Sequence, residues 1–336
     1  MNPVCDRLVY VLVSVFEDRE SAQQLLRAID AVQSDWGRIR VLLIDNGSIA
    51  EPIGKEDVRA LNLGIDVEIL TLSIDLGQQR AIAVGLATLA EREDAQVVVV
   101  MDGDGEDRPR DIPALANGVL AGTSEITVAG RGRRDDAMTM KALRWAYRKV
   151  FSVMTGETLP YGNFSAIGGR ALRRIVLMEE LWTHFPATLR RVGYPIDVID
   201  FDRGHRYAGN SKYNLVSLTV HALRSFVPFS ETVLARVLWA CGIVTALSLG
   251  TLFVAATMKG LGYTEPGWLT VVAGAVLTIV LQVGAIALIT LLIASTGRPW
   301  RNVTPTAIAK TFVADQVVVD AIFPPGASKH SRVVTK

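Results

Sequence analysis

Val97–Pro109 reads VVVVMDGDGEDRP and joins an apolar run to an acidic turn. Four valines and a methionine predict a strand that is apolar on both faces, as in a parallel sheet covered by helices on each side. Four acids follow at the point where such a strand leaves the sheet, namely Asp102, Asp104, Glu106 and Asp107. In open α/β sheets this edge is where ligands bind. The stretch therefore predicts an α/β fold with a polar site at the carboxyl edge of its sheet.

The spacing of the first two acids indicates a metal site. Only Gly103 separates Asp102 from Asp104, so both carboxylates can turn toward one hard divalent cation, Mg²⁺ or Mn²⁺. Such a cation usually keeps its remaining positions for water and substrate phosphates. The alternative is a solvated acidic turn after a core strand.

Charge and cysteine content exclude some classes of protein. The 336 residues contain 35 Lys and Arg against 34 Asp and Glu, so no overall positive field favours a nucleic-acid partner. Cys5 and Cys241 are the two cysteines, and they lie in regions too different to indicate a disulfide framework. Residues 1–18 lack a basic start followed by a cleavable apolar core, so we expect no export of the polar part.

Two apolar runs account for a mean hydropathy of +0.30. No charged residue occurs from Val237 to Met258 or from Trp268 to Thr296, and each run reaches the length of roughly 20 residues that is needed to cross a hydrocarbon core. The alternative is a pair of buried helices in a soluble protein. Basic residues flank the runs, so the positive-inside rule predicts an inner-membrane protein with the catalytic part and both termini in the cytoplasm.

The chain alternates between strands and helices on either side of the acidic turn. Apolar runs predict strands at 8–16, 40–44, 67–72, 127–130 and 196–201, in addition to 97–101. Helical spacing recurs from Ala22 to Val32, and Ala81–Leu89 predicts a helix of small residues that packs close to the sheet. This order predicts a mostly parallel sheet, with Asp45 and Asp102 opening on the same edge.

Four segments in order resemble the nucleotide-sugar half of a family-2 glycosyltransferase with the GT-A fold. They are Phe16-Glu17-Asp18, Ile44–Ser48, Leu76–Gln79 and Asp102–Pro109. The resemblance implies that Asp45 binds the nucleobase and that Asp102 and Asp104 hold the donor diphosphate through Mg²⁺ or Mn²⁺. It further implies nucleotide-sugar contacts from Phe16, Glu17, Gly77, Gln78, Asp102 and Gly103, and a third metal ligand in Glu106.

Three positions depart from the pattern of these relatives. Glu106 stands where many have glutamine, and Asn46 where many have a second aspartate. Asn163, in Tyr161-Gly162-Asn163-Phe164, stands where relatives commonly carry an aspartate at the active centre. A general base is therefore not evident, and an acceptor phosphate, ionised at neutral pH, needs none.

Basic residues indicate a phosphate-bearing acceptor. Arg131 begins a cluster of three arginines after a short strand, and this cluster suits either phosphate contacts or a solvated loop. Residues 203–213 resemble the loop that closes the site in polyisoprenyl-phosphate glycosyltransferases. The resemblance implies acceptor-phosphate contacts from Arg131, Lys141, Arg203, Arg206, Ser211 and Lys212, with catalytic roles for Asp102, Asp104 and Arg131. The helix predicted at 140–154, which carries Lys141, is basic and could lie beneath a lipid phosphate or be an ordinary amphipathic helix.

These patterns predict five parts. A cytoplasmic GT-A domain at 1–213 precedes an interfacial amphipathic helix at 214–232, transmembrane helices at 233–258 and 267–296, and a cytoplasmic tail at 297–336. Glycines in or near the spans could let helices approach closely or let subunits form a homo-oligomer; they are Gly242, Gly250, Gly260, Gly274 and Gly284.

The expected function is metal-dependent transfer of a sugar from a nucleoside-diphosphate sugar to a polyisoprenyl phosphate, such as undecaprenyl phosphate, at the cytoplasmic face of the membrane and without a nucleic-acid partner. Two alternatives stay open. One is a transferase of the same fold that uses another lipid or a polysaccharide as acceptor. The other is a non-catalytic membrane protein that binds a nucleotide sugar or serves as a scaffold.

Overall fold

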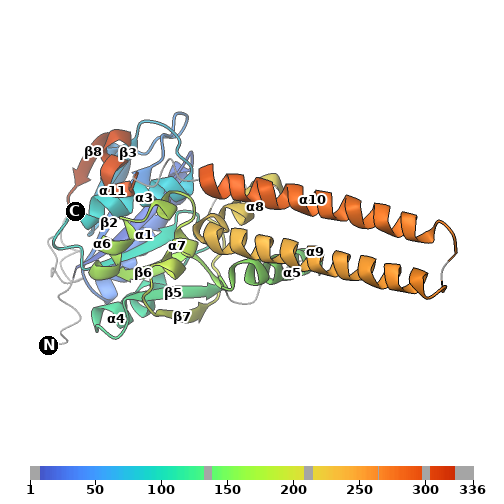
Figure 1. Ribbon diagram of the computed structural model, residues 1–336. Coiled ribbons are helices and arrows are strands. Elements are labelled where there is room, and N and C mark those ends of the chain that lie inside the picture. Colours follow the sequence, from blue (N-terminus) through green and yellow to red (C-terminus); the bar gives the residue numbers. More distant parts are fainter. Residues whose placement is uncertain (1–7, 132–137, 208–214, 264, 297–302, 322–336) are drawn as a thin grey trace, which may run out of the picture. The chain divides into compact units, whose positions relative to one another are not determined.

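The computed structural model describes residues 8–131, 138–207, 215–263, 265–296 and 303–321 (Figure 1). The chain divides into two compact units. The sheet unit comprises Met1–Arg144, Thr158–Pro228 and Asn302–Lys336, and the hairpin unit comprises Trp145–Glu157 and Phe229–Arg301. The catalytic part predicted from the sequence belongs to the sheet unit.

Within the described residues, the sheet unit is built on one eight-stranded, mostly parallel sheet of strand order β7-β5-β6-β4-β1-β2-β3-β8. The strands are β1 Val9–Val15, β2 Ile39–Asp45, β3 Asp66–Leu72, β4 Val97–Asp102, β5 Ile126–Arg131, β6 Tyr161–Gly168, β7 Ile196–Phe201 and β8 Val313–Val319. β1 pairs in parallel with β2 and β4, β2 with β3, and β5 with β7. β6 runs antiparallel between β4 and β5, and β8 runs antiparallel to β3.

Helices cover both faces of the sheet unit, as the apolar run at 97–101 predicts. They are α1 Arg19–Asp35, α2 Lys55–Arg59, α3 Gln78–Ala90, α4 Ile112–Leu120, α6 Gly169–Ile175, α7 Phe185–Arg191 and α11 Pro305–Ile308, with short 3₁₀ turns η1 Pro109–Asp111, η2 Glu179–Trp182 and η4 Ala309–Phe312. α8 Leu215–Arg224 follows the last of the central strands, and the 3₁₀ turn η3 Val227–Phe229 precedes the hairpin helices. Val97 and Val99 of β4 belong to one buried cluster, and Val98 and Val100 to the other. Alternate residues of the strand therefore face two separate cores.

The small residues of α3 let this helix approach the sheet closely. A Cβ added at Gly85 would lie 2.4 Å from the Cδ1 atoms of Leu12 and Ile44. A larger residue would have to displace the buried side chains of Leu12 and Ile44, so glycine favours the close approach of the helix. This packing confirms the expectation from Ala81–Leu89 and fixes the start of α3, where Gln78 and Gln79 stand, against the sheet edge.

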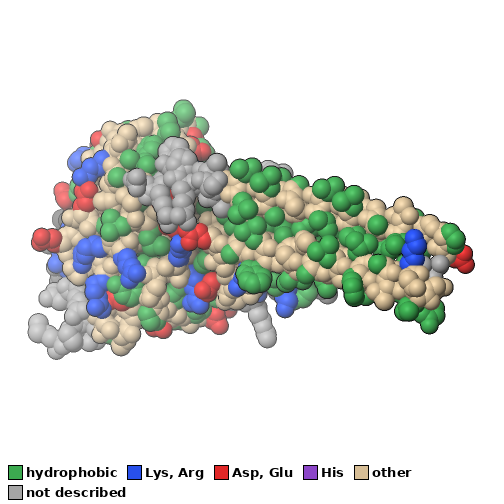
Figure 2. Space-filling view, viewed as in Figure 1, with side chains coloured by type: hydrophobic (Ala, Val, Ile, Leu, Met, Phe, Trp, Pro, Cys, Tyr) green, Lys and Arg blue, Asp and Glu red, His purple; other side chains and the backbone are tan. Residues whose placement is uncertain are grey.

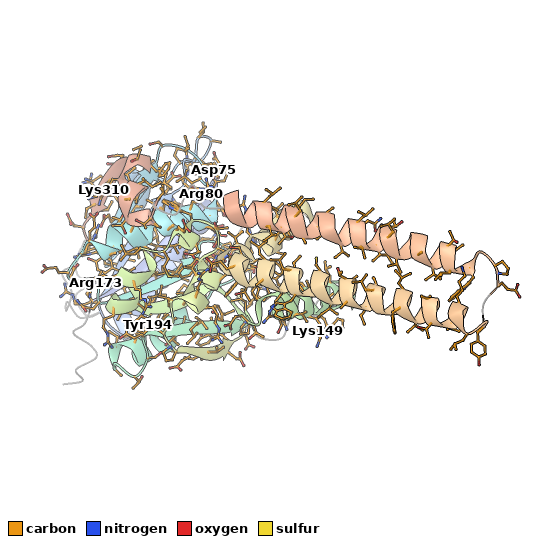
Figure 3. The ribbon with its side chains drawn as sticks, in the orientation of Figure 1. Asp75, Arg80, Lys149, Arg173, Tyr194 and Lys310 are labelled. Atoms are coloured by element: carbon orange, nitrogen blue, oxygen red, sulfur yellow. The ribbon has the colours of Figure 1, made fainter. Side chains whose placement is uncertain are left out.

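The C-terminal tail returns to the sheet. After α11 and η4, β8 pairs with β3 from Val67 opposite Val319 to Leu72 opposite Val313. Trp182 donates its indole N–H to the carbonyl of Val303 at 2.9 Å, and Lys310 (Figure 3) pairs with Glu91 at 2.9 Å. Residues 303–321 thus complete the sheet unit, whereas the sequence assigned them to a separate tail.

The hairpin unit contains two long apolar helices, α9 Ser230–Gly260 and α10 Trp268–Thr296, packed along each other. α5, Met138–Thr155, begins in the sheet unit and ends in the hairpin unit. Both long helices have the length and composition to cross a membrane, and 0% and 11% of their most apolar windows are buried. Hydrophobic side chains are spread along the visible face of α9 and α10, where charged ones are few, whereas charged ones gather over the sheet unit (Figure 2). The low burial argues against two core helices of a soluble protein.

The glycines of the hairpin unit make no close helix–helix contact. A Cβ added at Gly242, Gly250, Gly274 or Gly284 would meet no atom within 4 Å among the described residues. The close approach of α9 and α10 therefore does not depend on them, and self-association through these glycines stays a prediction.

Candidate active site

The carboxyl ends of the central strands converge as the sequence predicts. In the sheet register, Ser14 lies opposite Asp102 of β4, and Val15 lies opposite Asp45 of β2. Asp45 and Asp102 thus flank the end of β1 on one edge of the sheet. This arrangement places the acidic turn, residues 102–107, beside the loop that follows β2.

Backbone geometry lets the acidic turn fold tightly against β1. A Cβ added at Gly103 would lie 3.3 Å from the backbone oxygen of Ser14, so the turn passes close to the strand. The N–H of Asp102 donates to Asp107 Oδ2 at 2.9 Å, and the N–H of Glu106 donates to Asp104 Oδ1 at 2.9 Å. Two of the acids therefore hold the turn in shape in addition to carrying charge.

The arginine loop, residues 203–207, lies directly on the acidic turn. The N–H groups of Gly204 and Tyr207 donate to the carbonyls of Glu106 and Asp104 at 2.8 and 2.9 Å. Tyr207 packs on Gly105, where φ is +88° and an added Cβ would lie 2.6 Å from the ring. Main-chain hydrogen bonds and the packing of Tyr207 on Gly105 thus join two segments that are about one hundred residues apart in sequence. A side chain at position 105 would disturb this contact.

Two ion pairs connect the same segments. Arg206 Nη2 lies 2.6 Å from Asp104 Oδ2 and 3.9 Å from Glu106 Oε1, and Arg203 pairs with Glu106 Oε2. Burial raises the pKa of the Asp104 carboxyl, and the charges of Arg206 and Arg203 lower it in part. The net direction is upward, so Asp104 is a partly desolvated carboxyl beside a guanidinium.

Amide side chains surround Asp102. Gln78 Nε2 and Asn163 Nδ2 donate to the same oxygen, Asp102 Oδ1, at 2.8 and 3.0 Å. Asn163 Oδ1 in turn accepts from Gln79 Nε2 at 3.2 Å. Gln78 was predicted at the site, and Asn163 was noted as a departure; Gln79, Asp107 and Tyr207 were not predicted, although two consecutive glutamines at the start of α3 are a signal for the first of them.

Asp45 and Glu17, which were predicted to bind the nucleotide sugar, accept hydrogen bonds from backbone N–H groups of the loop after β2. Asp45 is 1% exposed, and its two oxygens accept the N–H groups of Ser48 and Ile53 at 2.9 and 3.2 Å. Glu17, at φ +47°, accepts the N–H groups of residues 49, 50 and 51. Both carboxylates therefore order the loop after β2, while Phe16 beside them is half-exposed.

Asn46 accounts for one departure from the family pattern. Its Nδ2 donates to Asp75 Oδ1 at 2.5 Å, and its Oδ1 accepts the N–H of Leu76 at 3.0 Å. Asp75 (Figure 3) also accepts the N–H of Gly77, where φ is +77°. An ionised aspartate at 46 could not donate to Asp75, so the amide joins the loop after β2 to the turn that starts α3.

The oxygen donors of the turn fit a hard divalent cation in part. Asp102 and Asp104 provide two carboxylates around a glycine that touches β1, and Mg²⁺ is commonly held by one or two carboxylates plus phosphate oxygens. In the part of the chain that the structure describes, no group of three His, Cys, Asp or Glu is placed to share an ion. The predicted third ligand, Glu106, is instead paired with Arg203.

The remaining predicted acceptor residues are only partly described. The backbone of Arg131 ends β5 opposite Phe201 of β7, next to the start of the arginine loop. Lys141 lies on α5, and the side chains of Arg131 and Lys141 fall outside what the structure describes, as do Ser211 and Lys212 altogether. Among the acceptor residues, Arg203 and Arg206 are thus the ones that the structure brings to the acidic turn.

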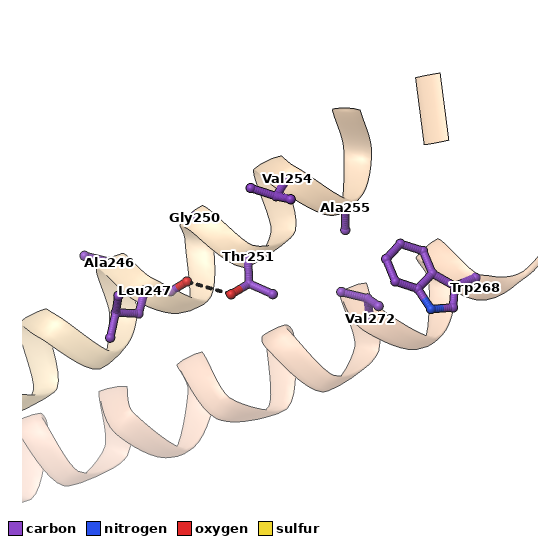
Figure 4. A pocket seen from close by; sticks show the side chains of 8 residues that line it. All are labelled: Ala246, Leu247, Gly250, Thr251, Val254, Ala255, Trp268 and Val272. Atoms are coloured by element: carbon purple, nitrogen blue, oxygen red, sulfur yellow. Dashed lines mark hydrogen bonds between the residues drawn. The ribbon is translucent and has the colours of Figure 1, made fainter. Parts of the chain in front are cut away.

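An apolar pocket of about 470 Å³ lies in the hairpin unit (Figure 4). Eight residues of α9 and α10 line it, and none is charged. Its hydroxyl, Thr251 Oγ1, donates to the carbonyl of Leu247 at 3.0 Å within the same helix. The pocket offers no reactive group, so the acidic turn and the arginine loop form the candidate active site.

Comparison with known proteins agrees with this geometry. Undecaprenyl-phosphate 4-deoxy-4-formamido-L-arabinose transferase of Enterobacter sp. (strain 638) is 24% identical over 266 residues, which cover 77% of this chain and 78% of that protein. Dodecaprenyl-phosphate galacturonate synthase of Rhizobium johnstonii is 23% identical over 190 residues, 55% of each chain.

A solved structure shows the same fold, and a family model gives the classification. Glucosyl-3-phosphoglycerate synthase from Mycobacterium tuberculosis, in complex with Mn²⁺, UDP and glucosyl-3-phosphoglycerate, has a TM-score of 0.50 at 14% identity and covers 67% of this chain and 80% of that one. This likeness shows the fold alone. The model of Glycosyl transferase family 2 matches residues 10–182, just over half of the 336 residues. The chain therefore belongs to glycosyl transferase family 2 and is a glycosyltransferase with the GT-A fold and two long apolar helices that could span a membrane.

Proposed function

We propose that this glycosyltransferase transfers a sugar from a nucleoside-diphosphate sugar to a polyisoprenyl phosphate, with Mg²⁺ or Mn²⁺, at the cytoplasmic face of the membrane. The observation that carries the proposal is the contact between Arg206 and Asp104. It joins cations suited to a phosphate to carboxylates suited to a metal. A relative that matches most of the chain is named for transfer to undecaprenyl phosphate.

Asp102 and Asp104 would hold the divalent cation. That cation, when bound, neutralises charge that develops on the leaving diphosphate. Gln78 and Asn163 keep Asp102 in place by their hydrogen bonds. Loops ordered by Glu17 and Asp45 supply the wall against which the nucleoside of the donor would lie.

Arg203 and Arg206 would orient the acceptor phosphate, together with Arg131, Lys141, Ser211 and Lys212. Guanidinium groups bind phosphate oxygens in a bidentate manner, which fixes the direction of attack. Both described arginines are paired with acids of the turn. Arg206 would become available to a phosphate once Asp104 holds a cation instead, so we expect the donor to bind before the acceptor.

The acceptor needs no strong base in this mechanism. Asn163 stands at the turn as an amide and cannot take a proton. A phosphate monoester carries close to two negative charges at neutral pH and can attack without first losing a proton. The amide at position 163 is therefore compatible with transfer to a phosphate and less so with transfer to a sugar hydroxyl.

The connectivity of the chain supports the membrane location. The strands of one sheet come from residues 9–201 and 313–319, and α9 and α10 of the hairpin unit lie between these ranges in sequence. If α9 and α10 cross a bilayer, the N-terminus of α9 and the C-terminus of α10 must lie on the same side of it, because the chain segments before and after the pair share one sheet. The positive-inside rule assigns that side to the cytoplasm.

The test is transfer by the full-length protein in lipid vesicles. We would supply a panel of UDP- and GDP-sugars, a short polyprenyl phosphate and Mg²⁺ or Mn²⁺, and identify the glycolipid by mass. Asp104→Ala should lower turnover about 10²- to 10³-fold, the effect of removing a main electrostatic group from a transition state. Glu93→Ala, which removes an exposed acid from the loop before β4, is the control and should retain full turnover.

Two results would contradict the proposal. The first is full turnover by Asp104→Ala. The second is a wild-type protein that releases free sugar or extends a polysaccharide but forms no glycolipid from any donor of the panel.

A further inference from the structure

A chain of hydrogen bonds leads from α7 to the acidic turn. The backbone N–H of Phe185 donates to Gln79 Oε1 at 2.6 Å, Gln79 Nε2 donates to Asn163 Oδ1 at 3.2 Å, and Asn163 Nδ2 donates to Asp102 Oδ1 at 3.0 Å. The residues come from α7, α3, β6 and β4, so the chain links four separate elements, of which α7, α3 and β6 are labelled in Figure 1. Gln79 is 6% exposed, and its hydrogen bonds in this chain do not involve Asp102 or Asp104 directly.

The direction of every bond in this chain is fixed by its first member. A backbone N–H can only donate, so Gln79 must offer its oxygen to Phe185 and its NH₂ to Asn163. Asn163 must then offer its oxygen to Gln79 and its NH₂ to Asp102. Neither side-chain amide can exchange the positions of its oxygen and its NH₂ group without breaking a hydrogen bond at each end.

We propose that Gln79 and Asn163 are positioning residues that hold the Asp102 carboxylate in the orientation required to bind the divalent cation. The inference rests on the proposed function and names residues of the same site that act through Asp102. Partners behind a metal ligand orient it, and their loss typically lowers metal affinity or activity about 10- to 100-fold.

A second hydrogen-bond donor further restricts the orientation of the Asp102 carboxylate. Gln78 Nε2 reaches the same Oδ1 atom at 2.8 Å. Two amide donors that converge on one oxygen restrict rotation of the carboxylate plane more than either would alone. Asn163 supplies one of the two, and its own orientation depends on Gln79.

Two substitutions perturb the chain in different ways. Asn163→Leu keeps a similar volume and removes the donor. Gln79→Glu keeps the shape and the bond from Phe185, but it leaves no hydrogen for Asn163. The Asn163 amide must then rotate to donate to the new carboxylate, and it presents its oxygen to Asp102 in place of its NH₂.

The experiment is a titration of the full-length protein with Mn²⁺ alone, in which free Mn²⁺ is followed by electron paramagnetic resonance. A parallel assay measures the Mn²⁺ concentration that gives half-maximal transfer. We expect both Asn163→Leu and Gln79→Glu to weaken Mn²⁺ binding about 10- to 100-fold and to raise that concentration by a similar factor. Gln96→Glu, which adds the same charge at an exposed position, is the matched control and should bind Mn²⁺ like the wild type.

A double variant, Gln79→Glu with Asn163→Leu, tests whether the two residues act through one chain of hydrogen bonds or independently. If Gln79 acts only through Asn163, then Gln79→Glu should add no further loss of Mn²⁺ affinity to Asn163→Leu. Additive losses would overturn the inference, and so would variants that bind Mn²⁺ like the control. If Gln79→Glu fails to fold, as shown by its melting curve, Asn163→Leu still decides whether the donor to Asp102 matters.

Failure of the proposed function would give a different result. A wild-type protein that binds no more Mn²⁺ than Asp104→Ala and forms no glycolipid contradicts the function itself. A wild-type protein that binds Mn²⁺ and transfers sugar, with unchanged Asn163→Leu and Gln79→Glu variants, contradicts only the positioning role.

Discussion

Burial and nearby charge act in opposite directions on the Asp104 carboxyl. Burial raises its pKa above the ordinary value of 3.8, and the lowering by Arg206 and Arg203 is smaller. The folded state therefore binds the proton more readily than the unfolded state does. The free energy of unfolding of the wild type therefore falls as the pH rises from below 3.8 through the raised pKa of Asp104. A variant with a neutral side chain at position 104 does not undergo this loss.

Asp104→Asn should therefore melt at a higher temperature than the wild type at neutral pH, even though its transfer activity is lost. The difference should shrink as the pH falls and vanish near the ordinary pKa of an aspartate. Melting curves of the full-length protein in EDTA between pH 4 and 8 measure it, because EDTA removes the contribution of bound metal. A lower melting temperature of Asp104→Asn at pH 7 would mean that the ion pair with Arg206 outweighs burial.

Single residues also show what could not be predicted from the sequence. The spacing of Asp102 and Asp104 indicated a metal site, and the resemblance placed residues 203–213 at that site. Neither could show that Arg206 pairs with Asp104, about one hundred residues away. The departures Asn46 and Asn163 looked like losses of a carboxylate. In the structure each amide donates to an aspartate, Asp75 or Asp102, a role that depends on neighbours brought together by the fold.

At the scale of elements, the pattern of apolar runs predicted the central strands because each is buried on both faces. β1, β2, β3 and β4 fall where the runs at 8–16, 40–44, 67–72 and 97–101 do. β6, Tyr161–Gly168, was not predicted because its two glycines and polar residues are typical of a loop. β8 was missed because an edge strand that follows a long apolar run gives no alternation strong enough to separate it from a tail.

β8 should be required for the stability of the sheet unit. It covers the edge of β3, and Gln316 Nε2 donates to Glu68, a buried acid that also pairs with Arg92. Burial acts to raise the pKa of Glu68, but the hydrogen bonds of Arg92 and Gln316 lower it overall. Because Arg92 still donates to both oxygens of Glu68, Gln316→Ala should cost about 1 kcal/mol, the usual net contribution of one hydrogen bond.

Two truncations extend this prediction to the whole element. Removal of residues 303–336 should lower the melting temperature further than Gln316→Ala and promote association through the exposed edge of β3. Removal of residues 322–336 leaves β8 in place and is the matched control. Equal melting temperatures for the two truncated proteins, measured in the same detergent, would show that β8 contributes nothing.

At the scale of the whole molecule, the return of the chain to its first sheet restricts how the protein can lie in a membrane. A single crossing would separate β8 from β3, which pair along most of their length. The helix pair must therefore cross twice or not at all. If it crosses twice, the connector between α9 and α10 emerges on the other side of the bilayer from the sheet, which predicts a labelling pattern.

We expect a membrane-impermeant maleimide to label Tyr263→Cys in intact bacterial cells when Cys5 and Cys241 are replaced by serine, since Tyr263 is 75% exposed in the connector. Arg173→Cys and Lys310→Cys, at exposed positions before and after the helix pair (Figure 3), should be labelled only after lysis, because the positive-inside rule assigns their side to the cytoplasm. Labelling of Arg173→Cys and Lys310→Cys in intact cells, with Tyr263→Cys protected, would reverse the orientation. Labelling of Lys310→Cys alone would contradict an even number of crossings, because Arg173 and Lys310 belong to the same sheet unit.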